Sequence, residues 1–378
     1  MTDTQPLPES GTPSGEEPRK LKVLLVGKAA PDRGGIPTFL EMLRTGELSR
    51  LADVELLNVA HAGVPQGGKF TGGNIKRTLA DARAVRRMAK GRDVVHIHSA
   101  LAPTVTVIRA GMLAAAARSA GAAVVMHAHG GELRSWLESD RRRAFLRRAM
   151  RPVAKVVAVW SAGLDMLQEV FPGERSVLVD NGIELDRWHP GPRDHSPPRI
   201  LYVGLLTPRK GVLDLAKASK ILRERGVAHE LRMLGGTPDE GPAAEAEVRE
   251  NLPEWADLLG RREPDDVPGV YSDADIFCLP SWWEAQPLSI LEAMGSGLPV
   301  VASDVGDVGR LVEDGRTGFV VPVKDPERLA DALEKLLADA GARRAMGDAG
   351  RKRAEEHFSA EVTARNLERI YREVTTHK

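Results

Sequence analysis

The stretch Ser281–Gly297 reads SWWEAQPLSILEAMGSG and decides the fold of this chain. An apolar run directly before it, Asp275–Leu279, predicts a strand, and the proline at position 287 predicts the start of a short helix over Ser289–Met294. A second apolar run, Pro299–Ala302, predicts the next strand. A strand, a loop, a helix and another strand in this order are typical of a parallel sheet in an α/β protein. The loop then lies at the carboxyl end of its strand, the edge where such sheets bind ligands.

The same alternation continues outward in both directions and predicts two α/β units. The further predicted strands are Leu21–Val26, Val94–His98, Ala123–Met126, Val156–Val159, Ser176–Val179, Ile200–Val203, His229–Leu234 and Gly318–Val321. The segment 186–199 is rich in Pro, Gly and polar residues and predicts a linker. We therefore expect two Rossmann-like, doubly wound domains facing each other across a cleft. The expected divisions are a disordered tail over 1–20, an N-terminal acceptor-binding domain over 21–185, the linker, a C-terminal nucleotide-sugar-binding domain over 200–357, and a helix over 358–378 that packs back on the N-terminal domain.

Composition excludes several classes of protein. The 378 residues are 42% hydrophobic and 28% charged, as in ordinary soluble globular proteins. The single cysteine, Cys278, excludes a disulfide framework and a multi-cysteine metal cage. Apolar runs stay below the roughly 18 residues that a membrane span needs. Residues 1–20 lack the apolar core of a secretory signal, so we expect a cytoplasmic protein.

Glu284 and Glu292 lie eight positions apart and flank the start of the predicted helix. A helix start leaves backbone N–H groups without intrahelical partners, here including those of Leu288 and Ser289, and such groups bind anions such as a diphosphate. Carboxylates accept hydrogen bonds from pairs of sugar hydroxyls, so the two glutamates predict a sugar on each side of the phosphate. The alternative is a pair of ordinary surface glutamates.

The run from Ser281 to Gly318 resembles the family 4 glycosyltransferases, which are retaining enzymes with the GT-B architecture of two facing Rossmann-like domains. The Glu-x7-Glu element, the glycine–proline step and the Val-Val-x-Ser/Thr strand of that family correspond here to Glu284, Glu292, Gly297–Pro299 and Val300–Ser303. The downstream steps Val305–Gly306, Glu313–Gly315 and Thr317–Phe319 also fit. The resemblance covers nearly the whole chain beyond the predicted tail, with its most specific motifs in the second half.

The resemblance implies roles for individual residues. Glu292 would bind the ribose of a nucleotide-sugar, and Glu284 would contact the transferred sugar. Lys210, in the Lys-Gly step after the first strand of the C-terminal domain, would bind the diphosphate. The family commonly has an arginine directly after the glycine of this strand, where this chain has Leu205. Arg209 could supply the missing charge, and a solvated turn is the alternative for both basic residues.

Gly34 and Gly35 stand between the first predicted strand and a predicted helix. A double glycine lets the backbone approach a ligand closely and presents free N–H groups at the helix start. In the family such a glycine loop approaches the donor phosphate, so the resemblance places both glycines among the donor-binding residues.

Histidines alternate at the ends of two predicted strands of the N-terminal domain. The resemblance assigns His129 to a place near the transferred sugar and holds His127 in reserve, and a structural histidine is the alternative for each. A metal pair of the two is disfavoured because no third ligand lies nearby in the sequence. We expect His98 and Ser99 to line the acceptor side.

The segment Arg141–Arg151 holds six arginines with three apolar residues between them and predicts an amphipathic helix. Residues 1–190 carry 27 Lys and Arg against 20 Asp and Glu, whereas residues 191–378 carry 26 against 33. This asymmetry favours an anionic or membrane-presented acceptor for the first half, with peripheral contact at an anionic membrane. Nucleic acid is disfavoured because aromatic residues make up only 4% of the chain. The alternative is a solvated helix.

These observations and the resemblance together predict a retaining glycosyltransferase. It would move a sugar from a UDP- or GDP-sugar to an acceptor hydroxyl, such as that of a lipid-linked or polysaccharide intermediate. The resemblance implies that no metal cofactor is needed. The alternatives are a GT-B nucleotide-sugar epimerase or phosphorylase and a non-catalytic GT-B partner subunit.

Overall fold

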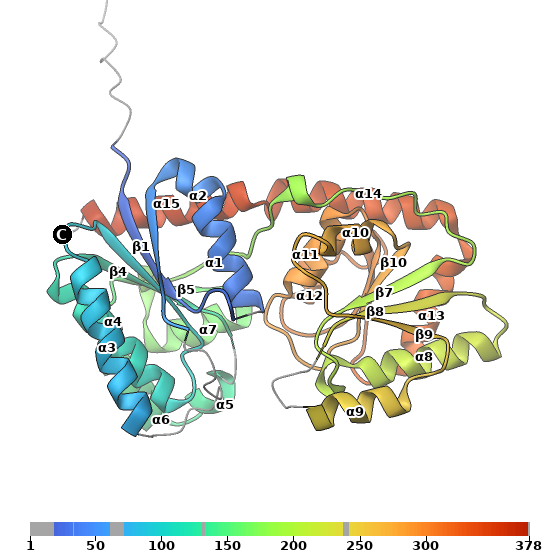
Figure 1. Ribbon diagram of the computed structural model, residues 1–378, viewed down its shortest axis with the longest axis horizontal. Coiled ribbons are helices and arrows are strands. Elements are labelled where there is room, and N and C mark those ends of the chain that lie inside the picture. Colours follow the sequence, from blue (N-terminus) through green and yellow to red (C-terminus); the bar gives the residue numbers. More distant parts are fainter. Residues whose placement is uncertain (1–18, 33, 61–71, 131–132, 237–241, 377–378) are drawn as a thin grey trace, which may run out of the picture.

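Two parallel sheets, each of six strands, organise the protein into two lobes that lie side by side (Figure 1). The computed structural model describes residues 19–32, 34–60, 72–130, 133–236 and 242–376. Residues 1–18 of the predicted tail lie outside the described residues, as do residues 61–71. The predicted α/β class with two Rossmann-like sheets is confirmed.

The first sheet has the strand order β2-β1-β3-β4-β5-β6, and all its strands are parallel. Its strands are β1 Lys22–Gly27, β2 Asp53–Asn58, β3 Val94–Ser99, β4 Ala123–Ala128, β5 Lys155–Ala158 and β6 Ser176–Leu178. Its helices are α1 Gly35–Thr45, α2 Glu47–Leu51, α3 Gly72–Met88, α4 Thr104–Ser119, α5 Leu133–Leu137, α6 Asp140–Ala149 and α7 Ser161–Val170. The order reverses between β1 and β3, so the loops that follow these two strands diverge and leave room for a ligand.

The second sheet has the order β12-β11-β10-β7-β8-β9 and reverses between β7 and β10. Its strands are β7 Arg199–Val203, β8 Glu230–Leu234, β9 Ala256–Gly260, β10 Ile276–Leu279, β11 Val300–Ser303 and β12 Gly318–Val321. Its helices are α8 Val212–Glu224, α9 Pro242–Asn251, α10 Val267–Ser272, α11 Leu288–Gly295, α12 Val308–Leu311 and α13 Pro326–Ala338. Short 3-10 turns occur at Gly173–Arg175, Leu185–Arg187 and Pro208–Lys210.

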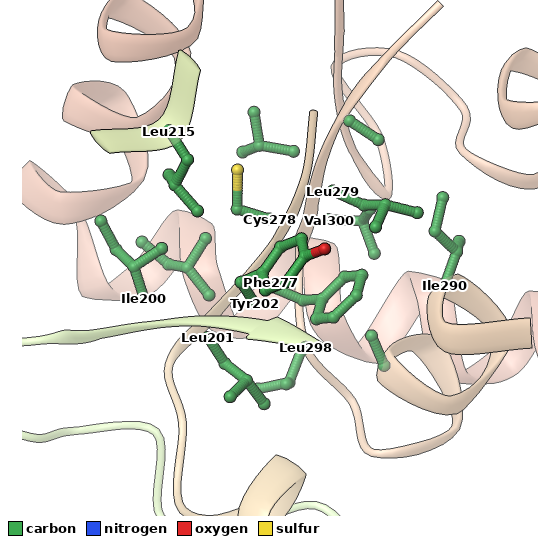
Figure 2. Close-up of a cluster of buried hydrophobic side chains, with 14 of the residues drawn as sticks. Ile200, Leu201, Tyr202, Leu215, Phe277, Cys278, Leu279, Ile290, Leu298 and Val300 are labelled. Atoms are coloured by element: carbon green, nitrogen blue, oxygen red, sulfur yellow. The ribbon is translucent and has the colours of Figure 1, made fainter. Parts of the chain in front are cut away.

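The strands are buried on both faces because helices cover both sides of each sheet. In the second lobe, Tyr202 of β7 and Phe277 of β10 are fully buried and pack with Leu215, Ile290 and Val300 (Figure 2). Each such side chain contributes about 1.5–3 kcal/mol through removal from water. This rigid core fixes the ends of β7 and β10, from which the site loops emerge.

The two C-terminal helices lie on different lobes (Figure 1). Helix α14, Ala340–His357, packs against α11 of the second lobe. Helix α15, Ala360–Thr376, returns to the first lobe, where Leu367, Ile370 and Tyr371 join Val23 and Leu25 in one buried cluster. The chain therefore crosses between the lobes twice, once between β6 and β7 and once between α14 and α15.

Candidate functional site

Loops at the carboxyl ends of the two sheets come into contact across the lobe boundary. A Cβ atom on Gly35, the first residue of α1, would lie 4.0 Å from Leu288 at the start of α11. A Cβ atom on Gly130, two residues after β4, would lie 3.0 Å from Ala285 and 3.4 Å from the ring of Trp283. We call the region where these loops meet the interlobe site. The structure thus brings the predicted glycine loop and the end of β4 to the glutamate stretch.

Lys210 and Glu284 form an ion pair at the switch point of the second sheet. Lys210 ends the turn after β7, Glu284 follows β10, and Nζ lies 2.5 Å from Oε1. The side chains are 18% and 10% exposed. Gly211 makes the approach of the two loops possible, because a Cβ there would lie 1.8 Å from the carbonyl oxygen of Pro280 and its φ is +70°. An ion pair this buried holds both charges in place for a ligand.

A second close approach fixes the other side of the loop that carries Glu284, which we call the glutamate loop. A Cβ on Gly306 would lie 2.3 Å from the carbonyl oxygen of Glu284, and the N–H of Asp307 donates to the carbonyl of Ala285 over 2.9 Å. The carboxylate of Asp307 reaches the first lobe, where it accepts from the N–H of Ser161 at 2.9 and 3.0 Å and from its hydroxyl at 2.5 Å. The Glu284 loop is therefore tied directly to the start of α7.

Gln286 forms a second tie between the lobes. Its side-chain oxygen accepts from the N–H of Asn181 over 2.5 Å, and its amide nitrogen donates to Asp180 over 2.5 Å. Arg310 also donates to Asp180, over 3.1 and 3.2 Å, and to Asp307 over 2.6 Å. The sequence motifs did not reveal this network, because its residues come from both lobes and lie far apart in the sequence.

Glu292 lies on α11 with its carboxylate held by Tyr271 of α10. The Tyr271 hydroxyl donates to Oε2 over 2.7 Å. Burial raises the pKa of Glu292, while the Tyr271 hydrogen bond and the charge of Arg187 oppose that rise. Burial, followed by the nearby Glu292 charge, raises the pKa of Tyr271 well above its usual value. Tyr271 therefore remains a hydrogen-bond donor that orients Glu292, and no sequence motif pointed to it.

Backbone amides gather at the start of α11 and around the glycine loop. Pro287 precedes α11, so Leu288 and Ser289 are its first two residues, while the N–H of Ile290 donates to the carbonyl of Pro287 over 3.3 Å. Gly34 has a φ of +117°, and among the described residues no atom beyond its chain neighbours lies within 4 Å of a Cβ built there. The two helix starts therefore offer N–H groups to an anion between the lobes.

Arg209 lies beside Lys210 in the turn after β7. Its carbonyl accepts from the N–H of Trp282 over 3.0 Å, which joins the turn to the glutamate loop. Its charge lowers the pKa of Tyr202, although burial and Glu284 raise that pKa more strongly. Arg209 thus lies in the turn that carries Lys210, beside the loop that carries Glu284, and not at position 205, where the family commonly has its arginine.

Four histidines stack at the end of the first sheet, and we call His96, His98, His127 and His129 the histidine column. Ring centroids of successive members lie 4.2 to 5.0 Å apart. His98 Nδ1 lies 2.8 Å from His129 Nε2, and His96 Nδ1 lies 2.7 Å from the Tyr371 hydroxyl. Burial lowers the pKa of His96 and His129 to about 3 and those of His98 and His127 well below their usual value. All four are therefore neutral near pH 7.

The column corrects two expectations. Because β3 pairs with β4, ring nitrogens of His96, His98 and His127 lie within 4.8 Å of one another, so the prediction that His127 has no third ligand nearby is wrong. These three could hold a metal ion, although the group consists of imidazoles alone, without a carboxylate to offset the charge of a dication. His98 is buried against His129, so it does not line an open acceptor surface as expected.

The predicted arginine helix is α6, and its apolar residues face the protein. Leu146 and Met150 are buried in the core of the first lobe, and Arg147 donates to the carbonyl of Val170 over 3.1 Å. Arg141 and Arg148 are exposed. Within the described ranges, no helix has the length and apolar content to cross a membrane.

Comparison with known families decides the assignment. Residues 31–187 match the family described as Glycosyltransferase Family 4, and residues 197–339 match the family described as Glycosyl transferases group 1. The alpha-maltose-1-phosphate synthase of Mycolicibacterium smegmatis is 32% identical over 277 residues, which are 65% of this chain and 68% of that protein. The chain belongs to glycosyltransferase family 4. The resemblance carried by the Glu284–Glu292 stretch is thereby confirmed.

Other relatives of this family 4 protein differ in the compounds for which they are named. The D-inositol 3-phosphate glycosyltransferase of Corynebacterium efficiens is 34% identical over 234 residues, 59% of this chain and 55% of that protein. The amylovoran biosynthesis glycosyltransferase AmsK of Erwinia amylovora is 30% identical over 207 residues, 53% of this chain and 51% of that protein. The matches thus span between half and about two thirds of these relatives' own lengths.

Solved structures share the two-lobed fold of this family 4 protein. Sucrose-phosphate synthase from Thermosynechococcus elongatus superimposes with a TM-score of 0.75 at 21% identity, covering 94% of this chain and 100% of that one. Anabaena HepE in complex with UDP and glucose superimposes with a TM-score of 0.70 at 17% identity, covering 93% and 99%. These likenesses confirm the predicted GT-B architecture.

Proposed function

We propose that this family 4 protein transfers a sugar from a nucleotide diphosphate donor to an acceptor hydroxyl with retention of the anomeric configuration. The observation that carries the proposal is the Lys210–Glu284 ion pair at the switch point of the second sheet. Glu292 lies on the helix that starts just beyond this pair, and the glycine loop of the first lobe faces that helix start.

Each group has a defined task in this proposal. Glu292, oriented by Tyr271, accepts hydrogen bonds from the ribose hydroxyls, and Glu284 contacts the transferred sugar. As the bond between the anomeric carbon and the diphosphate breaks, negative charge grows on the leaving oxygen. Lys210, Arg209, the amides of Leu288 and Ser289, and the Gly34–Gly35 loop stabilise this charge. These cations and N–H donors lower the energy of the diphosphate charge, and we infer that transfer needs no metal ion.

His129 completes the site from the first lobe. It follows β4 and precedes Gly130, whose backbone contacts the Glu284 loop. Because its imidazole is neutral near pH 7, it acts as a hydrogen-bonding group toward the transferred sugar and not as a cation.

The proposal is tested by measuring donor hydrolysis and sugar transfer by the full chain with each member of a panel of UDP- and GDP-sugars. UDP-sugars come first because Anabaena HepE has been solved with UDP and with UDP-glucose. We expect Glu292→Ala to raise the donor KM and Glu284→Ala mainly to lower kcat, each by about 10- to 100-fold. Glu356→Ala, which changes an exposed glutamate of α14, serves as the control. Near-normal kinetics in both site variants would contradict the assignment.

Three alternative functions give different ligand responses. A phosphorylase would be stabilised against thermal unfolding by inorganic phosphate more than by nucleoside diphosphates, and a nucleotide-sugar epimerase would convert the donor without releasing its nucleotide. A non-catalytic partner subunit would bind a nucleotide and leave every donor intact. The ion pair, Glu292 and the glycine loop together favour transfer over these alternatives.

We further propose an anionic or lipid-linked acceptor for an extracellular polysaccharide. Relatives are named for an inositol phosphate, a maltose phosphate and amylovoran. The first half of the chain carries the excess of positive charge, and α6 exposes Arg141 and Arg148. Flotation with anionic liposomes tests the contact, and we expect the double variant Arg141→Glu, Arg148→Glu to lose binding. Arg147 is left intact because it bonds α7. Equal flotation of both proteins, or none of the wild type, removes this part of the proposal.

A further inference from the structure

Two histidines on adjacent strands share one hydrogen bond at the edge of the interlobe site. His98, on β3, and His129, just after β4, are joined between Nδ1 and Nε2 over 2.8 Å, and the N–H of His129 donates to the carbonyl of Ser99 over 3.0 Å. Phe39 of α1 packs against both imidazoles, with ring centroids 5.9 and 5.5 Å away. The backbone and Phe39 therefore fix the place of the pair.

The shared hydrogen bond allows only two arrangements of protons. Both rings are neutral because burial holds their pKa values far below 7, so each ring carries one N–H. If His98 donates, its Nε2 is a bare lone pair and His129 carries its proton on Nδ1. If His129 donates, the proton of His98 lies on Nε2, which is fully buried and has no hydrogen-bond partner in the described part of the chain.

The burial of His98 Nε2 distinguishes the two arrangements. A buried N–H group without an acceptor is rare in native proteins. The Nε2 atoms of the neighbouring His96 and His127 are also buried and form no hydrogen bond within the described ranges, so neither ring accepts such a proton in a hydrogen bond. His129 is only partly buried, and its Nδ1 has no hydrogen-bond partner among the described residues. A proton on that nitrogen is therefore available to a ligand.

We propose that His98 is a positioning residue that holds His129 as its Nδ1–H tautomer, so that His129 donates a hydrogen bond to an oxygen of the bound donor sugar. The role of the donated bond rests on the proposed function, whereas the tautomer does not. Histidine tautomers are set in this way wherever one ring nitrogen is engaged by a fixed partner. His98 itself makes no contact with the substrate.

Substitutions at His98 separate the hydrogen bond from the packing. Asparagine places its side-chain nitrogen at the position of the histidine Nδ1, so His98→Asn keeps a donor for His129. Phenylalanine preserves a ring against Phe39 and removes the donor. His127→Phe changes another ring of the column that has no hydrogen bond at either nitrogen, and it serves as the control for packing.

The first measurement is a long-range 15N–1H correlation spectrum of the full chain with 15N-labelled histidine. The His129 signals are assigned by their loss in His129→Gln. We expect the Nδ1–H pattern for His129 in the wild type, in His98→Asn and in His127→Phe, and a shift toward the Nε2–H form in His98→Phe. An Nε2–H pattern in the wild type, or an unchanged tautomer in His98→Phe, overturns the proposal.

Kinetics supply the second measurement. We expect His98→Phe to lower kcat for sugar transfer by about 10- to 100-fold with the donor KM within about threefold of the wild type, and His98→Asn to retain most of the turnover. If His98 had only a structural role, kcat would fall to the same extent in both variants. That result would overturn the positioning role. An Nδ1–H tautomer in a chain that transfers no sugar from any donor refutes the proposed function while upholding the tautomer.

Discussion

Replacement of Lys210 by methionine probes the centre of the site most directly. Methionine preserves much of the volume and removes the charge, which leaves the carboxylate of Glu284, on a side chain that is 10% exposed, without its cation. The loops that carry the two residues are held together by the close approach of Gly211 to Pro280, so Glu284 has little freedom to move into water.

The magnitude follows from this burial. Removal of one partner from a fully buried ion pair costs about 3–5 kcal/mol because the other charge is left uncompensated. The Lys210 side chain is 18% exposed, so some water reaches the pair, and we expect a loss of about 2–4 kcal/mol. For a lobe of this size the loss corresponds to a fall in Tm of about 4–16 °C. Loss of the charge that faces the leaving diphosphate should also lower kcat by about 100- to 1,000-fold.

The assay is a double-mutant cycle read by thermal unfolding and by sugar transfer. Glu284→Gln in the Lys210→Met background removes the stranded charge, so the double variant should recover more than half of the lost stability while remaining inactive. Lys352→Met is the matched control, since Lys352 pairs with Glu356 at 3.9 Å with side chains 74% and 54% exposed. That control should cost less than about 0.5 kcal/mol. A Tm for Lys210→Met as close to the wild type as that of the control would refute the reasoning.

Three further changes test the surroundings of the pair. Tyr271→Phe removes the hydrogen bond that orients Glu292 and should raise the donor KM about tenfold in steady-state kinetics, with kcat nearly unchanged. Gly306→Ala should lower turnover about 100-fold by displacing the glutamate loop, whereas Gly315→Ala, also at positive φ but in open space, should retain activity. The histidine column binds protons in the unfolded chain near pH 6.5 but in the folded chain only at much lower pH, near 3 for two members. The free energy of unfolding, measured by denaturant titration, should therefore fall as pH decreases from about 6.5, by up to about 1.4 kcal/mol per pH unit for each histidine. A flat stability profile between pH 6.5 and 4 would contradict the burial of these rings.

Local sequence patterns predicted the strands that form the centres of both sheets. Runs such as those of β1, β4 and β11 are continuously apolar because both faces are covered, and each is recognisable by itself. β2 escaped prediction because it lies at the sheet edge, with half-buried residues and two acidic side chains in DVELLN. An edge strand of this composition has little to distinguish it from a loop.

Much of the candidate site could also be predicted, but its contacts could not. Glu284 and Lys210 each follow a strand, and their pairing depends on the reversal of strand order that makes β7 and β10 neighbours. The proximity of His98 to His127 and His129 likewise depends on the pairing of β3 with β4. The tie between Ser161 and Asp307 spans 146 positions, and no local pattern encodes such a separation. The residues of the site could therefore be predicted where a motif contains them, whereas the contacts between them depend on the order of the strands in the sheets.

The return of α15 to the first lobe has a consequence for biosynthesis. The buried cluster that contains Val23 and Leu25 is incomplete until Leu367, Ile370 and Tyr371 have been added. A nascent chain that has left the ribosome as far as β12 holds a second sheet with its strands complete, while the face of the first sheet that α1 and α15 cover together still lacks the part contributed by α15. The first lobe is therefore synthesised first but completes its core last. Part of its apolar surface stays accessible to chaperones until α15 has been synthesised.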